Sequence, residues 1–317
     1  MRVSSTTSPV GSAAIASRPG SVEPRALGEL GLIAPLAFGC WRFADDDLAG
    51  AVAAVATAVD EFGVQGTRVL VDNADVYGQE FGAAESLLGR VLRSTPSLTD
   101  RFVLATKAAI PPGGVGYDTS GEYLSAACDA SLTRLGVDVI DLFQLHRVDL
   151  FTPPAEVAAA LASLREAGKI REIGVSNATV AQLDDLERHL PFPVAAVQAE
   201  FSLLDQRPLF DGVLDWCTRR GAVPLAYSPL GGGRLGERGG DILGDLSDRL
   251  DALAAREGVD ITAICLAFLL AHPSRPVPIV GTQRHDRLGA LAAATRVTLD
   301  RADIYGLLEA ARGSPLP

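Results

Sequence analysis

The sequence has few cysteines, and their spacing excludes several kinds of site. The four are Cys40, Cys128, Cys217 and Cys265, scattered along 317 residues with no CxxC pair. No histidine lies at metal-ligand spacing from any of them, so the usual zinc sites are excluded and we expect no metal centre. An even count in a chain of this length does not by itself indicate a disulfide framework. We expect four reduced thiols, most of them in the core, in a cytoplasmic protein.

Positive charge and membrane signals are also scarce. The chain has 28 basic against 39 acidic residues, for a net charge of −11. Nucleic acids and anionic membranes require a basic face, so we expect neither as a partner. The N-terminus, MRVSSTTSPVGSAAIASRPGS, lacks the apolar core of a signal peptide, and the apolar run around Ile264 to Ala271 is too short to span a bilayer. The expected partner is a small molecule, and the sequence leaves open whether the protein is a monomer or a homo-oligomer.

The composition is that of one globular domain with an N-terminal extension. The chain is 48% hydrophobic and 21% charged. Residues 1–24 are rich in Ser, Thr, Gly and Pro, and are predicted to form a flexible tail. No linker or break in composition follows, so residues 25–317 are predicted to form a single domain.

A β-rich run, a loop and a helical segment repeat from about Leu32 to about Ala293. The eight runs are PLAFG (35–39), RVLVDN (68–73), FVLATK (102–107), VIDLFQLH (139–146), REIGVSN (171–177), VAAVQAE (194–200), AVPLAYS (222–228) and VPIVGT (277–282). Most lack strict alternation, which is typical of parallel strands buried on both faces. Eight such units predict a (β/α)₈ TIM barrel with its site at the carboxyl ends of the strands. The stretch LGELGLI (27–33) is expected to cap the bottom of the barrel as an N-terminal β-hairpin.

Segments with helical periodicity lie between these runs. They cover residues 47–62, 83–92, 122–135, 154–167, 180–190, 207–219 and 246–256. Thr152, and either Asn177 or Thr179, are expected to cap the helices that follow them. Gly136 and Gly168 stand where a helix C-cap is expected.

Four polar residues stand at the ends of three predicted strands. Asp72 and Tyr77 close RVLVDNADVYG, Lys107 closes RFVLATK, and His146 closes VIDLFQLH. Lys107 is one of only two lysines in a chain that otherwise uses arginine. Lysine has a pKa that moves readily on burial, whereas arginine stays charged. This choice of residue at a strand end indicates a proton-transfer site.

The chemistry of these groups is complementary. A tyrosine has a pKa near 10, and a neighbouring cation lowers it by stabilising the phenolate. Lys107 could serve as that cation with Asp72 balancing its charge, while His146 hydrogen-bonds the oxygen of a carbonyl. Each residue also has an ordinary alternative: a turn cap for Asp72, a half-buried aromatic for Tyr77, a core histidine for His146, and a snorkelling side chain for Lys107.

No protein nucleophile is evident, so a cofactor must donate the hydride or group. Residues 231–236, GGGRLG, match G-x-G-x-x-G, but they follow the seventh strand and are weak evidence for a Rossmann site. Their backbone can still approach a pyrophosphate. VGTQRHDRL (280–288) opens a helix after the eighth strand, where Arg284 and Arg287 suit a phosphate. The alternative is two solvated arginines.

These motifs together resemble the aldo-keto reductases. VDNADVYGQEFGAAESLLGRVL (71–92) is similar to that family's Asp and Tyr signature, and FVLATK, DLFQLHRVD, IREIGVSN, VAAVQAEFSLLDQ and PLAYSPLGGGRLG follow in the family's order. The resemblance covers Arg25 to Leu299. It implies a (β/α)₈ barrel that uses NADPH, less often NADH, to reduce aldehydes and ketones.

The resemblance also implies a role for individual residues. Tyr77 would be the general acid, Lys107 would tune its pKa, Asp72 would hold the lysine, and His146 would orient the carbonyl. The implied cofactor residues are Ser176, Asn177 and Gln198 at the nicotinamide carboxamide, Tyr227 stacked on the nicotinamide ring, Ser228, Leu230 and Gly232 at the pyrophosphate, and Thr282, Arg284 and Arg287 at the adenosine 2′-phosphate.

The chain departs from the family at the adenine. A Glu-Asn pair is common there, and the corresponding positions are Ala290 and Leu291. Residues that follow the first and fourth strands are expected to shape the substrate pocket, namely Trp41, Phe43, Arg147 and Phe151. Arg147 would favour an anionic or polyol substrate.

Two other functions remain open. One is an NAD-dependent sugar or alcohol dehydrogenase, and the other is a non-catalytic, cofactor-sensing subunit on the same barrel. The sequence leaves the carbonyl compound and the direction of the reaction unassigned, because fold does not determine substrate.

Overall fold

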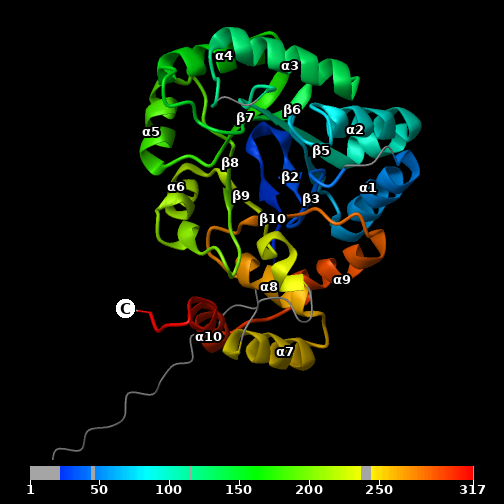
Figure 1. Cartoon of the computed structure of the whole chain (residues 1–317), viewed down its shortest axis with the longest axis vertical. Helices are drawn as coiled ribbons and strands as arrows, with labels where there is room; N and C mark the ends of the chain where they lie inside the picture. The colour runs from blue at the N-terminus through cyan, green and yellow to red at the C-terminus, as the bar shows by residue number, and fades with distance from the viewer. Residues whose placement is uncertain (1–21, 44–46, 114–115, 237–243, 317) are drawn as a thin grey trace, which may run out of the picture.

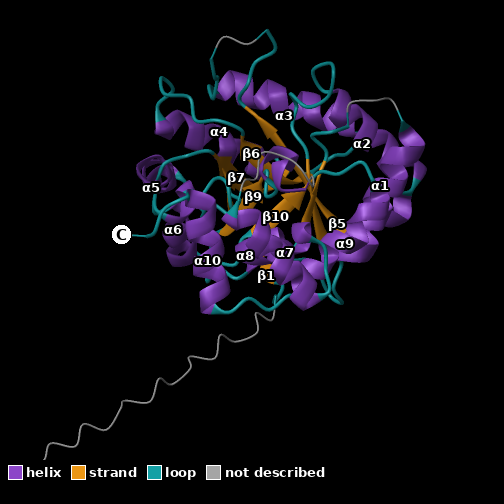
Figure 2. Ribbon diagram, turned by 60° about the horizontal axis from the view of Figure 1, so that its bottom comes forward, coloured by secondary structure: helices purple, strands orange, loops and turns teal. Residues whose placement is uncertain are grey.

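The computed structural model describes residues 22–43, 47–113, 116–236 and 244–316. In these residues eight parallel strands close into a barrel in the order β10-β3-β4-β5-β6-β7-β8-β9. The strands are β3 (Ala37–Gly39), β4 (Val69–Asp72), β5 (Phe102–Ala108), β6 (Ile140–Leu145), β7 (Ile170–Ser176), β8 (Ala196–Glu200), β9 (Val223–Tyr227) and β10 (Val277–Val280). Each lies within or beside its predicted run, and the (β/α)₈ prediction is confirmed (Figures 1 and 2). Most of the predicted tail, residues 1–21, lies outside the described residues.

The helices form a ring around the barrel (Figure 1). They are α1 (Leu48–Phe62), α2 (Ala83–Ser94), α3 (Gly121–Leu135), α4 (Pro154–Glu166), α5 (Val180–His189), α6 (Val213–Arg220), α7 (Asp245–Glu257), α8 (Ile261–Leu270), α9 (Leu288–Ala292) and α10 (Arg301–Arg312). Helices α7 and α10 lie side by side beyond α8, on the flank of the barrel where the C-terminus lies.

Two details of the predicted helices are wrong. Residues 207–219 do not form one helix, because the 3₁₀ turn Arg207–Leu209 ends before Gly212, which has φ 85°. Helix α6 then begins at Val213, whose amide donates to the Asp211 carboxylate. Thr152 does not cap α4, since its hydroxyl donates to Asp149 instead.

Other predicted caps are confirmed. Thr179 caps α5 in a reciprocal capping box with Gln182. Gly136 ends α3 in the left-handed conformation with φ 69°, which glycine adopts without steric cost.

The predicted hairpin closes the bottom of the barrel. Strands β1 (Arg25–Ala26) and β2 (Leu32–Ile33) pair antiparallel. The Arg25 guanidinium donates to the carbonyl oxygens of Ala222 and Ser274. Leu27 is fully buried in the same cluster as the inward-facing residues of the strands. The hairpin therefore acts as a plug that excludes water from the end opposite the site.

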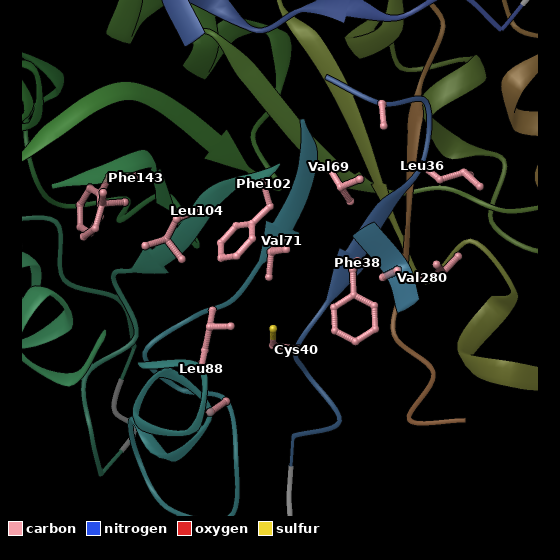
Figure 3. Close-up of a cluster of buried hydrophobic side chains, with 14 of the residues drawn as sticks. Leu36, Phe38, Cys40, Val69, Val71, Leu88, Phe102, Leu104, Phe143 and Val280 are labelled. Carbon is pink, nitrogen blue, oxygen red and sulfur yellow. The ribbon is translucent and has the colours of Figure 1, made fainter. Parts of the chain in front are cut away.

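The strands are apolar on both faces, which explains why their sequences do not alternate. In β4, Leu70 faces the interior cluster, while Val69 and Val71 join the outer layer against the helices. Figure 3 shows part of that outer layer, with Leu88 of α2 facing side chains of the neighbouring strands such as Phe102. Toward the carboxyl ends of the strands, the inward-facing positions are occupied by polar residues. The alternation of inward and outward positions along each strand therefore places these residues at the site.

Three further observations concern the described part of the chain. It contains no helix long and apolar enough to cross a membrane. It contains no group of three or more His, Cys, Asp or Glu side chains that could hold a metal ion. The four cysteines are free and buried, as predicted for core thiols.

Candidate active site

Lys107 is the centre of the polar cluster inside the barrel. Its side chain is fully buried at the end of β5. The ammonium donates to Asp72 Oδ2 at 2.7 Å, to the Asn73 carbonyl oxygen at 2.8 Å and to the Tyr77 hydroxyl at 3.1 Å. These acceptors account for all three donors of the ammonium, so the buried charge is paired and hydrogen-bonded.

Asp72 is held from its other oxygen by two amides. Gln144 and Gln198 donate to Oδ1 at 3.1 and 2.9 Å. Gln144 belongs to β6 and is the register partner of Lys107. The carboxylate is therefore fixed by side chains from β5, β6 and β8, which helps to orient the lysine so that it presents one donor to Tyr77.

Tyr77 lies in the loop between β4 and α2. Its amide donates to the Ala74 carbonyl oxygen at 3.1 Å, and its carbonyl accepts from the Ala84 amide at 3.1 Å. The pKa of Tyr77 is raised above its ordinary value, because burial outweighs the opposing effect of Lys107. Lys107 lowers the pKa as expected, but burial more than offsets this effect, so Tyr77 keeps its proton and can act as a donor.

His146 stands edge-on to Tyr77, with ring centroids 5.7 Å apart and an interplanar angle of 84°. Burial, with the nearby charges of Lys107 and Arg147, lowers its pKa to about 3. The imidazole is therefore neutral at physiological pH. Its Nδ1 is buried and has no hydrogen-bond partner among the described residues.

The pKa of Lys107 is raised above its ordinary value. Burial alone would lower it, but Asp72 and Tyr77 outweigh burial. The site at neutral pH thus holds a charged lysine, a protonated tyrosine and a neutral histidine. This is a cluster that can give a proton to an oxyanion.

The predicted nicotinamide residues gather at the same rim. Ser176 and Asn177 follow β7, and the Asn177 amide donates to Ser176 Oγ at 2.8 Å. The Tyr227 hydroxyl, at the end of β9, donates to Asn177 Oδ1 at 2.9 Å. Gln198 is buried against Asp72, so this group adjoins the cluster of Lys107.

Unusual backbone conformations concentrate in the loops that follow. Asn177 and Ser228 have φ of 56° and 49°, in the left-handed region that few residues other than glycine adopt. Gly231, Gly232 and Gly233 have φ of 59°, 72° and 105°. Such conformations cluster at ligand sites, where backbone must approach a bound group closely. Leu230 precedes this loop and is half-buried.

The third predicted cofactor segment follows β10. Thr282 Oγ1 accepts from the Arg284 amide at 3.1 Å. The Arg284 guanidinium makes a two-point pair with the Asp286 carboxylate, at 3.2 and 2.6 Å. Arg287 is exposed. Arg284 therefore already has an anionic partner, and a phosphate group would have to compete with Asp286 for it.

A family model and two named relatives match most of the chain. The family model described as "Aldo/keto reductase family" matches residues 35–311. The chain belongs to the aldo/keto reductase family. A protein of Novosphingobium aromaticivorans named 6-dehydroglucose reductase is 42% identical over 92% of this chain and 97% of its own length. A protein of Agrobacterium fabrum with the same name is 33% identical over 88% of this chain and 94% of its own length.

Two solved structures of aldo-keto reductases have the same fold. A thermostable aldo-keto reductase in complex with the inhibitor epalrestat has a TM-score of 0.76 and 26% identity, covering 91% of this chain and 99% of its own. An aldo/keto reductase from Klebsiella pneumoniae in complex with NADP and acetate has a TM-score of 0.74 and 27% identity, covering 93% of this chain and 96% of its own.

The residues predicted to contact substrate in this aldo-keto reductase differ widely in exposure. The side chains of Trp41 and Phe151 are 64% and 95% exposed. Phe43 is buried and packs against Phe38, with ring centroids 6.0 Å apart, so it can shape the pocket only by supporting the rim from below. Arg147 is half-buried and interacts electrostatically with the Tyr227 hydroxyl. Contact of these residues with a substrate stays a prediction.

Two apolar residues occupy the positions at which the family commonly has a Glu-Asn pair, and they differ in exposure. Ala290 is exposed, but Leu291 is buried in the core cluster. The Leu291 side chain therefore supports helix α9 and offers no polar group to an adenine.

Two residues of the cluster were not predicted. Gln144 could have been found from its position two residues before His146, in a buried strand, on the face that also carries Leu142. Asp75, between Asp72 and Tyr77, gives no signal of burial in the sequence, yet it is completely buried.

Proposed function

We propose that this aldo-keto reductase reduces an aldehyde or ketone with NADPH, and that Tyr77 donates the proton. The observation that carries the proposal is the buried contact between the Lys107 ammonium and the Tyr77 hydroxyl, 3.1 Å apart, with Asp72 behind the lysine. A fixed cation beside a phenol stabilises the phenolate that forms once the proton has left.

Each member of the cluster has a separate task in this proposal. Tyr77 gives its proton to the carbonyl oxygen as negative charge develops there. Lys107 stabilises the resulting phenolate, and Asp72 keeps the lysine in place. His146, neutral because its pKa is lowered to about 3, orients the carbonyl oxygen by a hydrogen bond and adds no charge.

The rim residues fit a nicotinamide dinucleotide. Asn177, Ser228 and the three consecutive glycines 231–233 all have positive φ, and glycines in such conformations let the backbone approach a pyrophosphate closely. Ser176, Asn177, Gln198 and Tyr227 would hold the nicotinamide, and Thr282, Arg284 and Arg287 the adenosine phosphate. When bound, this cofactor supplies the hydride that reduces the carbonyl carbon. The NADP complex of the Klebsiella pneumoniae relative supports the choice of NADP.

A hydroxylated aldehyde is the substrate class that we propose. The two relatives named 6-dehydroglucose reductase support it, since each matches nearly the whole chain. Polar side chains at the rim support it as well. Arg147 interacts electrostatically with Tyr227, and the Arg207 guanidinium lies 3.5 Å from the Glu200 carboxylate. Such groups can bind sugar hydroxyls without requiring a charged substrate.

The proposal is tested by following NADPH consumption with purified protein. We expect turnover of 6-dehydroglucose, with a larger kcat/KM than for an aldehyde of similar size that lacks hydroxyl groups. Faster turnover with NADH than with NADPH would instead favour the NAD-dependent dehydrogenase. NADPH binding without turnover of any aldehyde or ketone would overturn the proposal.

A further inference from the structure

Asp75 is an unpaired acid inside the protein. It stands between Asp72 and Tyr77 and is completely buried. Neither carboxyl oxygen has a hydrogen-bond partner among the described residues. A buried carboxylate without partners is costly, whereas the neutral acid is tolerated far better.

The charged neighbours of Asp75 come from three elements. Glu85 of α2 is completely buried, accepts from the Thr106 hydroxyl, and lies 2.6 Å from Arg134 of α3. Tyr123 of α3 and Lys107 of β5 also interact electrostatically with Asp75. Arg134 is thus already paired with Glu85, and a charged Asp75 would be a second carboxylate beside one half-buried guanidinium.

The backbone of Asp75 connects Lys107 to the loop that carries Tyr77. The Asp75 amide donates to the Lys107 carbonyl oxygen at 3.0 Å, and the Asp75 carbonyl accepts from the Gly82 amide at 2.6 Å. The Ala84 amide, at the start of α2, donates to the Tyr77 carbonyl oxygen. A displacement of Asp75 would therefore be transmitted to both partners of the Lys107–Tyr77 contact.

We propose that Asp75 is a positioning residue, whose carboxyl group must stay protonated for Asp72, Lys107 and Tyr77 to keep their arrangement. Its ionisation places two carboxylates in one buried space, and the loop 73–82 relieves the repulsion by moving or by admitting water. The Tyr77 hydroxyl then leaves its position beside the lysine. The enzyme would lose activity at alkaline pH through a group that contacts neither substrate nor cofactor.

The titration range of Asp75 supports this proposal. Burial, then Glu85, raises the pKa of Asp75 to about 8. The pKa values of Tyr77 and Lys107 are raised above their ordinary values, and that of His146 is lowered to about 3. Because Tyr77 and Lys107 are also titratable, only the comparison of wild type with an Asp75 variant assigns a loss of activity near pH 8 to Asp75.

The test compares the wild type with Asp75→Asn, which has nearly the same shape but carries no charge. The readout is kcat for 4-nitrobenzaldehyde at saturating NADPH from about pH 6 to about pH 10. We expect the wild-type kcat to fall about tenfold between pH 7 and pH 9, as the protonated fraction falls, and the variant to change by less than about twofold. Asp60→Asn, at an exposed residue paired with Arg101, is the matched control and should follow the wild type.

A second readout is the melting temperature, Tm, which does not depend on catalysis. The activity readout, by contrast, rests on the proposed carbonyl reduction. An acid whose pKa is raised in the folded protein keeps its proton over a range of pH in which the unfolded chain has already released it. The ordinary pKa of an aspartate in an unfolded chain is near 3.9. Stability should therefore fall as pH rises from about 4 to about 8, and the Tm of Asp75→Asn should lack that part of the fall.

The outcomes separate the two proposals. A flat Tm difference between wild type and Asp75→Asn across this range would overturn the inference whatever the activity. An unchanged alkaline fall in kcat of the variant, or a folded variant that is inactive at pH 7, would overturn it too. Absence of turnover in the wild type would count against carbonyl reduction only, and Tm would still decide the protonation state of Asp75.

Discussion

The Lys107 ammonium nitrogen lies 3.1 Å from the Tyr77 hydroxyl oxygen, yet the pKa of Tyr77 is raised above its ordinary value. Burial of the phenol outweighs the attraction of the lysine for the phenolate. The lysine therefore does not ionise the tyrosine in advance. It limits the cost of the phenolate that forms during the reaction, and the tyrosine remains a proton donor over the physiological range.

Replacing Lys107 should destabilise the fold as well as abolish activity. Lys107→Met would leave the Asp72 carboxylate buried without its cation, at a cost of about 3–5 kcal/mol. Lys169→Met is the matched control, because Lys169 pairs with Asp129 near the surface, with side chains 34% and 53% exposed. Solvent screens that pair, so Lys169→Met should cost much less stability than Lys107→Met. Urea unfolding at neutral pH measures both changes.

The double variant Asp72→Asn/Lys107→Met tests whether this loss of stability comes from the unpaired Asp72 carboxylate. Removing both charges takes away the unpaired carboxylate, so the double variant should be more stable than Lys107→Met alone. If the two single lysine variants lost equal stability, the buried pair would not have the energetic role that we assign to it.

Substitution of Arg284 and substitution of Asp286 should change NADPH affinity in opposite directions. Arg284→Ala should weaken NADPH binding about tenfold or more, the equivalent of one charge-assisted hydrogen bond, and should leave NADH binding nearly unchanged. Asp286→Asn should strengthen NADPH binding, because the guanidinium loses its competing two-point partner. Titration of Trp fluorescence with each nucleotide measures both. Equal losses for NADPH and NADH in Arg284→Ala would place the phosphate elsewhere.

Arg147 gives a prediction about substrate preference. Arg147→Ala should lower kcat/KM more for anionic or polyhydroxylated aldehydes than for a neutral, unsubstituted aldehyde, because only the former offer acceptors to the guanidinium. A parallel set of assays with the three aldehydes checks it. An identical loss for all three would mean that Arg147 acts through its electrostatic interaction with Tyr227 and does not contact the substrate.

The strands of the barrel were predictable because burial on both faces leaves a strong local signal. Each predicted run corresponds to one strand, from β3 to β10. Helix α8 has no such signal, since it is apolar on nearly all sides and therefore shows no helical periodicity. The break before α6 depends on the conformation of Gly212, which the periodicity of residues 207–219 does not reveal.

The site was predictable to the extent that polar groups end apolar strands. Lys107 and His146 could be placed at one rim by the barrel topology alone. The net pKa of Tyr77 could not be predicted, because it depends on the balance between burial and a charge at a known distance. Asp75 was missed for a similar reason: an aspartate in a loop is ordinarily exposed, and its buried neighbourhood includes residues of α2 and α3 that the local sequence does not reveal.

The central claim is that Tyr77 donates the proton, and Tyr77→Phe tests it most directly. The measurement is kcat for NADPH-dependent reduction of 6-dehydroglucose, with NADPH affinity determined in parallel. We predict a fall in kcat of about 10²–10⁴-fold with unchanged NADPH affinity, while Tyr305→Phe, at an exposed position on α10, keeps wild-type activity. A Tyr77→Phe enzyme that turns over at the wild-type rate would contradict the account.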